Sequence, residues 1–184
     1  MKWSRPSVST WPEARLRITR FPSLTEPQFL GCVAAFVDSL SGELNAAAAA
    51  LRRLAGQPKG AAFSYEMALD THRYGALIVL DRWSTLVHAF GAHVALSTRR
   101  NIIDEAPARV QTAENLLGRA NQLIDAAPSY NNELVQACVL AFQSLNVTFA
   151  EEREAAEQSA RLGPMLPEEY TETRRIFLED LAAR

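Results

Sequence analysis

The feature that most constrains the fold is a row of residues with helical spacing between positions 65 and 94. Successive members lie three or four positions apart, which places them on one side of an α-helix. The row consists of Tyr65, Leu69, His72, Ala76, Leu80, Trp83, Val87, Phe90 and Val94. Its length predicts either one long helix or two helices that meet near Gly75. In both cases other helices must cover its apolar face.

Shorter periodic segments with helix-start and helix-stop residues fill most of the remaining chain. Thr25 opens a capping-box sequence, and we expect Gly42 to separate this first helix from an alanine-rich one that stops at Gly56. The next predicted helix is capped by Asp104 and ends at Pro128. Each of these segments has an apolar face with period 3.6, so they are expected to pack side by side.

Two more helices are predicted near the end of the chain. One begins at Ser129 or Asn131 and ends at Gly163, and the last begins at Pro167. The pattern as a whole predicts an all-α fold. We expect a single-domain antiparallel bundle of about six helices over residues 25–184, preceded by an extended N-terminal arm over residues 1–24.

The predicted arm differs from the rest of the chain in charge and in proline content. Its five basic residues against one acidic residue give it a net charge of +4, which leaves −6 for residues 25–184 of a chain whose total is −2. Three prolines exclude a long helix in this segment. The sequence therefore predicts a basic strap that packs its larger apolar side chains onto an acidic body. These side chains are Trp11, Leu16, Ile18 and Phe21.

Composition limits the classes of function. A net charge of −2 with 22% charged residues gives no basis for general nucleic-acid binding. The first residues lack the apolar segment of a signal peptide, and no apolar run is long enough to span a bilayer, so we expect a cytoplasmic protein. Cys32 and Cys138 have neither CxxC spacing nor a nearby histidine, so we expect two buried free thiols. No glycine-rich nucleotide loop or nucleophile elbow occurs, and we expect neither a cofactor nor a metal.

A polar strip runs beside the apolar row of the longest predicted helix. It consists of Glu66, Asp70, Arg73, Asp81, Ser84 and His88. Its Asp-Ser-His trio has the composition of a hydrolase triad, but a serine within a helix lacks both a strained turn and free backbone donors for an oxyanion. Glu66 and Asp70 could offer two carboxylates to a divalent ion, although charges on a helix flank are usually solvated. The strip is nevertheless the best candidate site in this helix.

Arg82 and His88 form an Arg-x5-His pattern in the same segment. This pattern resembles the Arg-x(4–6)-His signature of HEPN ribonucleases, which are all-helical. The resemblance covers these two residues, and Trp83 takes a position that is usually polar in that family. It implies that His88 and Arg82 would assist attack of a ribose 2′-hydroxyl on the adjacent phosphate.

Several glutamates follow the apolar stripe of the helix that ends near Gly163. They are Glu151, Glu152, Glu154 and Glu157. They form either a solvated helix surface or an acidic patch that binds a basic partner, and the chain's own arm could also occupy such a patch.

Our leading hypothesis is a non-enzymatic cytoplasmic protein-binding module, such as an inhibitor, an immunity (antitoxin-like) protein or an adaptor. It rests on the absence of catalytic motifs and on the separation of charge between arm and body. The alternatives are a HEPN-type ribonuclease that uses Arg82 and His88, and a helical bundle that binds a small ligand between its helices. The sequence leaves the partner open, and it leaves open whether the chain forms a homo-oligomer.

Overall fold

The structure is a computed structural model that describes residues 26–90, 100–162 and 167–183. Regular structure in these residues consists of α-helices. They are α2 (Glu26–Leu54), α3 (Phe63–Phe90), α4 (Arg100–Ala126), α5 (Asn132–Leu162) and α6 (Pro167–Ala182). The prediction of an all-α fold is confirmed. The extended arm predicted over residues 1–24 and the predicted cap at Thr25 lie outside the described residues.

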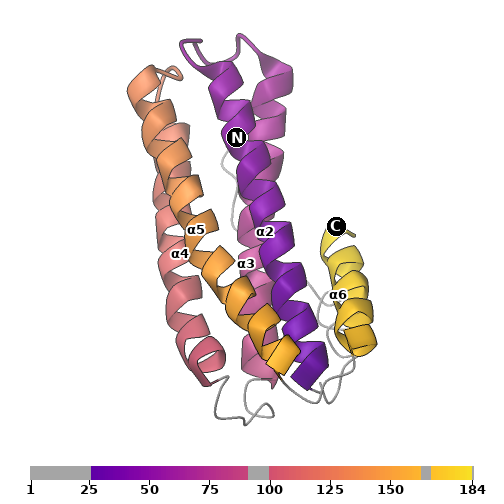
Figure 1. Ribbon diagram of the computed structural model, residues 1–184. Coiled ribbons are helices and arrows are strands. Elements are labelled where there is room, and N and C mark those ends of the chain that lie inside the picture. The colour runs from indigo at the N-terminus through magenta and orange to yellow at the C-terminus, as the bar shows by residue number, and fades with distance from the viewer. Residues whose placement is uncertain (1–25, 91–99, 163–166, 184) are drawn as a thin grey trace.

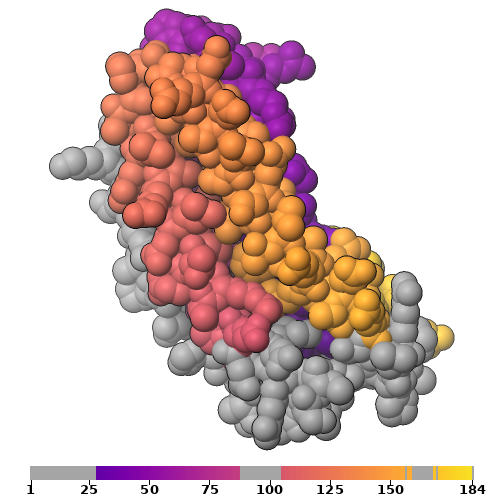
Figure 2. Space-filling model, turned by 60° about the vertical axis from the view of Figure 1, so that its left-hand side comes forward, coloured from indigo at the N-terminus to yellow at the C-terminus, as the bar shows by residue number. Residues whose placement is uncertain are grey.

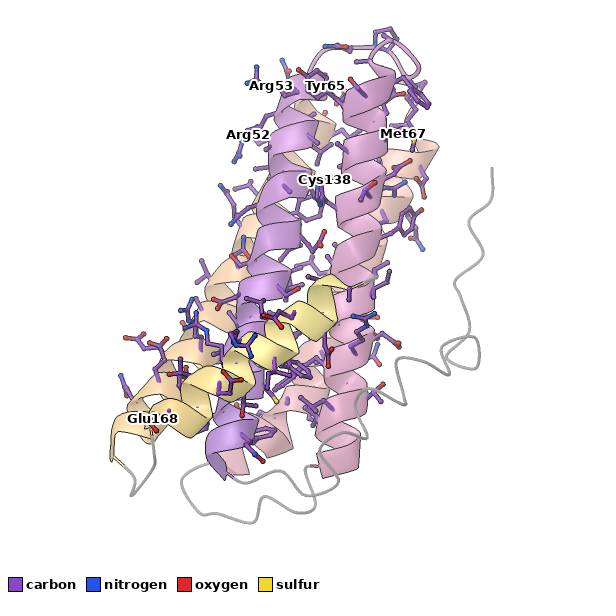
Figure 3. All side chains as sticks on the ribbon, turned by 90° about the vertical axis from the view of Figure 1, so that its right-hand side faces the viewer. Arg52, Arg53, Tyr65, Met67, Cys138 and Glu168 are labelled. Atoms are coloured by element: carbon purple, nitrogen blue, oxygen red, sulfur yellow. The ribbon has the colours of Figure 1, made fainter. Side chains whose placement is uncertain are left out.

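Four long helices form an antiparallel bundle, and a shorter helix crosses one of its sides (Figure 1). α2 packs against α3 and α5, and α4 packs against the same two helices, so the four enclose a common core. α6 packs against α2. Figure 3 shows α6 running obliquely over α2, with its C-terminal end beside α3.

The N-terminal half of α2 lies at the centre of the molecule. Every residue from Phe29 to Val37 is buried, because α3, α5 and α6 surround this half of the helix. Gly31 allows α6 to approach closely: a Cβ at this position would lie 2.7 Å from the carbonyl oxygen of Tyr170 and 3.0 Å from the backbone nitrogen of Arg174. The α2–α6 interface therefore includes a close approach of the two backbones at Gly31.

Aromatic side chains fill the core at this end of the bundle. The ring of Trp83 from α3 stacks on that of Phe36 from α2, with ring centroids 4.5 Å apart. Phe149 from α5 meets Phe36 edge-on at 5.3 Å. Such pairs add stacking energy to the large apolar area they bury. One cluster therefore ties α2, α3 and α5 together, with Trp83 in the core as its place in the apolar row predicts.

Over the described ranges the number of helices differs from the prediction because α2 continues through Gly42. An interior glycine costs a helix only about 1 kcal/mol relative to alanine. Packing of α2 on both sides of Gly42, through the buried Leu40 and Leu44, outweighs this cost. α3 is likewise unbroken at Gly75, so the longest apolar row forms one helix over its described part.

The opposite end of the bundle is closed by two loops that bind each other. The backbone nitrogen of Gly56 donates to the carbonyl oxygen of Tyr130 at 2.7 Å, and that of Tyr130 donates to Gln57 at 2.9 Å. Asn131 caps α5, since its side-chain oxygen accepts a 2.8 Å bond from the backbone nitrogen of Leu134. Of the two starts predicted for α5, Ser129 and Asn131, the second is confirmed to within a residue, and α6 begins at Pro167 as predicted. The cap predicted at Asp104 is wrong, because α4 already begins at Arg100 and Asp104 lies within it.

Candidate functional site: a groove between α4 and α5

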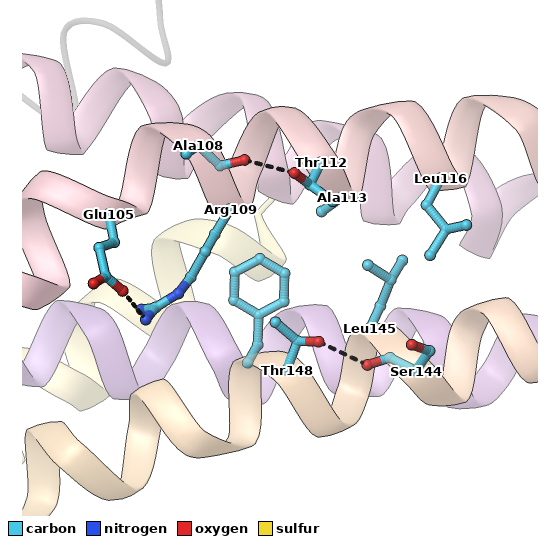
Figure 4. Close-up of a pocket in the computed structure, with 10 residues that line it drawn as sticks. Glu105, Ala108, Arg109, Thr112, Ala113, Leu116, Ser144, Leu145 and Thr148 are labelled. Carbon is cyan, nitrogen blue, oxygen red and sulfur yellow. Dashed lines mark hydrogen bonds and ion pairs between the residues drawn. The ribbon is translucent and has the colours of Figure 1, made fainter.

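A groove of about 390 Å³ lies between α4 and α5. Figure 2 looks onto this side of the bundle, where the two helices lie next to each other. Small and apolar side chains line most of the groove, and Arg109 and Glu105 stand at one end (Figure 4). The lining includes Ala108, Thr112 and Leu116 from α4, and Ser144, Leu145 and Thr148 from α5.

The outer surface of α5 beside the groove carries no charge. Residues 134–150 include no Asp, Glu, Lys, Arg or His. Leu140 and Val147 lie within one helical turn of Ser144 on either side, and their exposed fractions are 57% and 63%. On α4, the exposed Leu123 lies two turns beyond Leu116 on the same side. An uncharged and partly apolar strip therefore borders the groove on α5, whereas on α4 the exposed Arg119 lies between Leu116 and Leu123.

Behind the charged end of the groove lies a carboxylate that lacks hydrogen-bond donors. Glu152 of α5 is 2% exposed, and neither of its carboxylate oxygens has a hydrogen-bond partner. Its ion-pair partner is Arg109, whose Nη1 lies 3.9 Å from Oε1 of Glu152. The Nη2 of Arg109 instead donates to Glu105, four residues earlier on α4. Arg109 therefore lies close to two carboxylates but donates a hydrogen bond only to that of Glu105.

Burial dominates the protonation of this carboxylate. Loss of solvent raises the pKa of Glu152 from 4.5 to about 7, Arg109 lowers it in part, and the negative charge of Glu105 raises it further. Glu152 therefore changes charge near neutral pH, directly behind the groove.

The structure separates the four glutamates that the sequence grouped into one acidic patch. Glu151 and Glu154 are exposed, as a partner-binding surface requires. Glu157 is half-buried and accepts a 3.1 Å bond from Nε of Arg153. Glu152 points to the interior, which removes it from any acidic surface and places it beside the groove.

The first half of the predicted polar strip binds α3 to its neighbours. Arg73 is buried, and its guanidinium donates to Asp70 at 2.8 Å and across the interface to Asp125 of α4 at 2.5 Å. Glu66 accepts a 2.7 Å bond from the backbone nitrogen of Gly60. These residues hold the α3–α4 interface and the 56–62 loop, and the carboxylates of Glu66 and Asp70 are already engaged.

In the second half of α3, Arg82, which is not a member of the polar strip, contacts α6. Asp81 and Ser84 are half-buried, while the side chain of His88 lies outside the described residues. Arg82 donates to the carbonyl oxygens of Asp180 at 3.0 Å and Leu181 at 3.2 Å. A cation at these last carbonyls of α6 satisfies acceptors that the helix leaves free.

No cluster in the described residues has the composition of a metal site. Within them, no group of three or more His, Cys, Asp or Glu side chains is placed to hold an ion. Cys32 and Cys138 are buried free thiols, and burial raises the pKa of both. Their thiolate forms are therefore scarce at neutral pH.

Sequence reasoning missed the groove, although its signal was present. Residues 134–150 of α5 carry no charge on any face, whereas packing against the core requires apolar residues on one face only. Two apolar side chains in this run, Leu140 and Val147, are exposed. By length and composition, α5 from Asn132 to Ala155 could also cross a membrane, and 39% of the tested window is buried in the bundle. Core helices of water-soluble bundles share this property.

Comparison with known proteins does not extend this description. A scan against protein-family models, a search of curated proteins and a search of solved structures each found no match to this chain.

Proposed function

We propose that this chain is a non-enzymatic protein-binding module whose α4–α5 groove receives an amphipathic helix of a partner protein. The observation that carries the proposal is the uncharged outer face of α5, with Leu140 and Val147 exposed beside the groove. The centres of protein interfaces are depleted in charged residues, and a helix laid into an apolar groove is a common mode of recognition.

The charges around the groove favour a particular orientation of the partner. Glu105, Glu151 and Glu154 are exposed near one end, whereas the other end is uncharged along α5. A partner helix with an apolar ridge and basic residues at one end would match both features. Opposite charges speed such an encounter more than they deepen its affinity, and salt screens them over about 8 Å at physiological ionic strength.

Inhibitors, immunity (antitoxin-like) proteins and adaptors act by this kind of binding, and we place the chain in that broad class. A small apolar ligand is the second candidate, because 390 Å³ falls in the range of about 300–1,000 Å³ found for ligand pockets. The nuclease alternative has less support, since Arg82 would first have to leave the two carbonyl oxygens of α6.

In-cell photo-cross-linking tests the proposal. Val147→p-benzoylphenylalanine places a reactive group beside the groove, and Glu172→p-benzoylphenylalanine places the same group on the exposed side of α6. We expect a protein adduct from position 147 and not from position 172, with the cross-link on an amphipathic, basic-ended helix of the partner. We also expect the double change Glu151→Lys and Glu154→Lys to lower the yield at low salt.

Three results would contradict the proposal. They are the absence of an adduct at position 147, the same adducts at both positions, or an adduct with a second copy of this chain. The last of these would identify the groove as a homodimer interface.

A further inference from the structure

We infer that the charged end of the α4–α5 groove is a recognition site for one cationic side chain, a lysine or arginine of the partner, which Glu152 binds. This inference rests on the proposed function and adds the chemistry by which the partner is selected. It arises from an excess of carboxylates over cations among three residues, Glu105, Arg109 and Glu152.

The three residues bring two carboxylates to one guanidinium. Arg109 donates a hydrogen bond to Glu105 and remains 3.9 Å from Glu152, beyond hydrogen-bonding distance. Both oxygens of Glu152 lack a donor although the residue is 2% exposed. Buried carboxylates are ordinarily paired or hydrogen-bonded. An incoming ammonium or guanidinium would supply both the missing charge and the missing donors.

Arg109 lies between the groove, which it lines, and Glu152, whose Oε1 is 3.9 Å from its Nη1. The side chains of Arg109 and Glu105 are 33% and 56% exposed and lie one turn apart on α4, and this pair would have to move toward solvent for a cation to reach Glu152. The stem of a lysine or arginine would then lie along the small side chains of Ala108, Thr112 and Thr148. Long basic side chains commonly pack their stems on such surfaces.

Among the described residues, the charges that act on Glu152 come from α4. They are the cation of Arg109 and the anion of Glu105. Asp38 of α2 and Arg174 of α6 do not compete, because Asp38 binds both Arg174 and Arg153, the next residue along α5. The protonation of Glu152 thus depends on its burial and on these two neighbours in α4.

Binding of a cation at this site should strengthen as pH rises. Burial raises the pKa of Glu152 to about 7, so the carboxylate is mostly protonated at pH 6 and mostly ionised at pH 8. A cation binds the ionised form, and the ionised fraction grows roughly tenfold over this interval. We therefore expect affinity to rise by about the same factor.

The test uses the full chain and hexylammonium, which reproduces the stem and charge of a lysine side chain. Binding is followed through the NMR methyl signals of Leu116 and Leu145, two apolar residues of the groove. Wild type is compared with Glu152→Gln and with Glu133→Gln, the same change in the first turn of α5 at the opposite end of that helix. Glu152→Leu serves as a second variant if Glu152→Gln does not fold.

We expect hexylammonium to shift both methyl signals with roughly tenfold higher affinity at pH 8 than at pH 6. Glu152→Gln should lose this binding and its pH dependence, and Glu133→Gln should keep both. Equal binding of hexanoate, or unchanged binding by folded Glu152→Gln, would overturn the inference. If hexylammonium binds as expected but no protein adduct forms at position 147, the proposal of a protein partner would be contradicted and the cation site would still be supported.

Discussion

Two sides of the molecule differ in how their apolar surface is covered and how their buried charges are paired. On the α2 side, α6 covers the bundle, Gly31 lets the backbones touch, and Asp38 binds Arg153 and Arg174. On the α4–α5 side no described helix covers the groove, Leu140 and Val147 are exposed, and Glu152 lacks hydrogen-bond donors. Within the described residues, apolar surface and buried charge are covered by other parts of the chain on the α2 side and are not covered on the α4–α5 side. A partner protein bound on the α4–α5 side would cover this apolar surface and supply hydrogen-bond donors to Glu152.

The largest expected effect is on the covered side. Trp83→Ala removes a fully buried ring that stacks on Phe36 and leaves a cavity among α2, α3 and α5. We expect the free energy of unfolding to fall by about 3–5 kcal/mol, as measured by urea denaturation. A decrease in unfolding free energy of less than about 1 kcal/mol would show that the core among α2, α3 and α5 is not tightly packed.

The next largest effect concerns the buried carboxylate of Glu152, which lacks hydrogen-bond donors. Glu152 ionises at about pH 7 when folded and near pH 4.5 when unfolded, so its burial costs stability progressively as pH rises between these values and fully above pH 7. Glu152→Gln removes that cost. We expect its advantage over wild type in unfolding free energy to grow by about 2–3 kcal/mol between pH 5 and pH 8.

Glu151→Gln is the matched control, because it makes the same change at an exposed neighbour. Its difference from wild type should stay nearly constant with pH. If the difference in unfolding free energy between Glu152→Gln and wild type were also independent of pH, the pKa of Glu152 would not be raised by folding. Glu152 would then already have a cationic or hydrogen-bonding partner in solution.

A smaller effect tests the contact between α2 and α6. In Gly31→Ala the new Cβ would lie 2.7 Å from the carbonyl oxygen of Tyr170, so α6 must shift, and we expect a loss of about 1–3 kcal/mol in urea denaturation. Gly118→Ala on α4 meets no atom within 4 Å and should gain up to about 1 kcal/mol from helix propensity. Effects of the same sign at both positions would contradict a tight α6 interface.

The smallest effect on stability belongs to the open side. Val147 and Val139 lie on exposed and buried faces of α5. Val147→Gln should change the unfolding free energy by no more than about 0.5 kcal/mol, whereas Val139→Gln should destabilise the fold by 1 kcal/mol or more, on the order expected for burying an unpaired amide. Thermal denaturation of the two variants would test this, and similar losses would indicate that Val147 supports the core.

Local sequence signals predicted most of the fold because helix starts and apolar rows act within a few residues. Asn131 and Pro167 marked helix starts, and the row through Trp83 gave α3 its buried face. The break predicted at Gly42 was wrong, since tertiary packing overrides the propensity of one residue. Neither the contact between Arg82 and the end of α6 nor that between Arg73 and Asp125 could be predicted, because each joins residues far apart in the sequence.

The position of Glu152 shows where a closer reading of the sequence would have succeeded. Leu145, Phe149 and Glu152 are spaced by four and three residues, so Glu152 continues the buried row of α5 and not its solvated face. Grouping it with Glu151 and Glu154 followed chain order instead of helical position. The groove itself depends on how α4 and α5 are spaced, which no local pattern specifies.

Filling the groove chemically tests the central claim most directly. Cys32 and Cys138 are buried with raised thiol pKa values, so a cysteine introduced by Thr148→Cys, at an exposed position that lines the groove, is the one that a bulky maleimide labels. Arg52→Cys, exposed on α2, receives the same label as a control. The account predicts that the partner captured through position 147 no longer binds protein labelled at position 148 and still binds protein labelled at position 52. Equal binding to both labelled proteins would contradict the claim that the α4–α5 groove is the binding site.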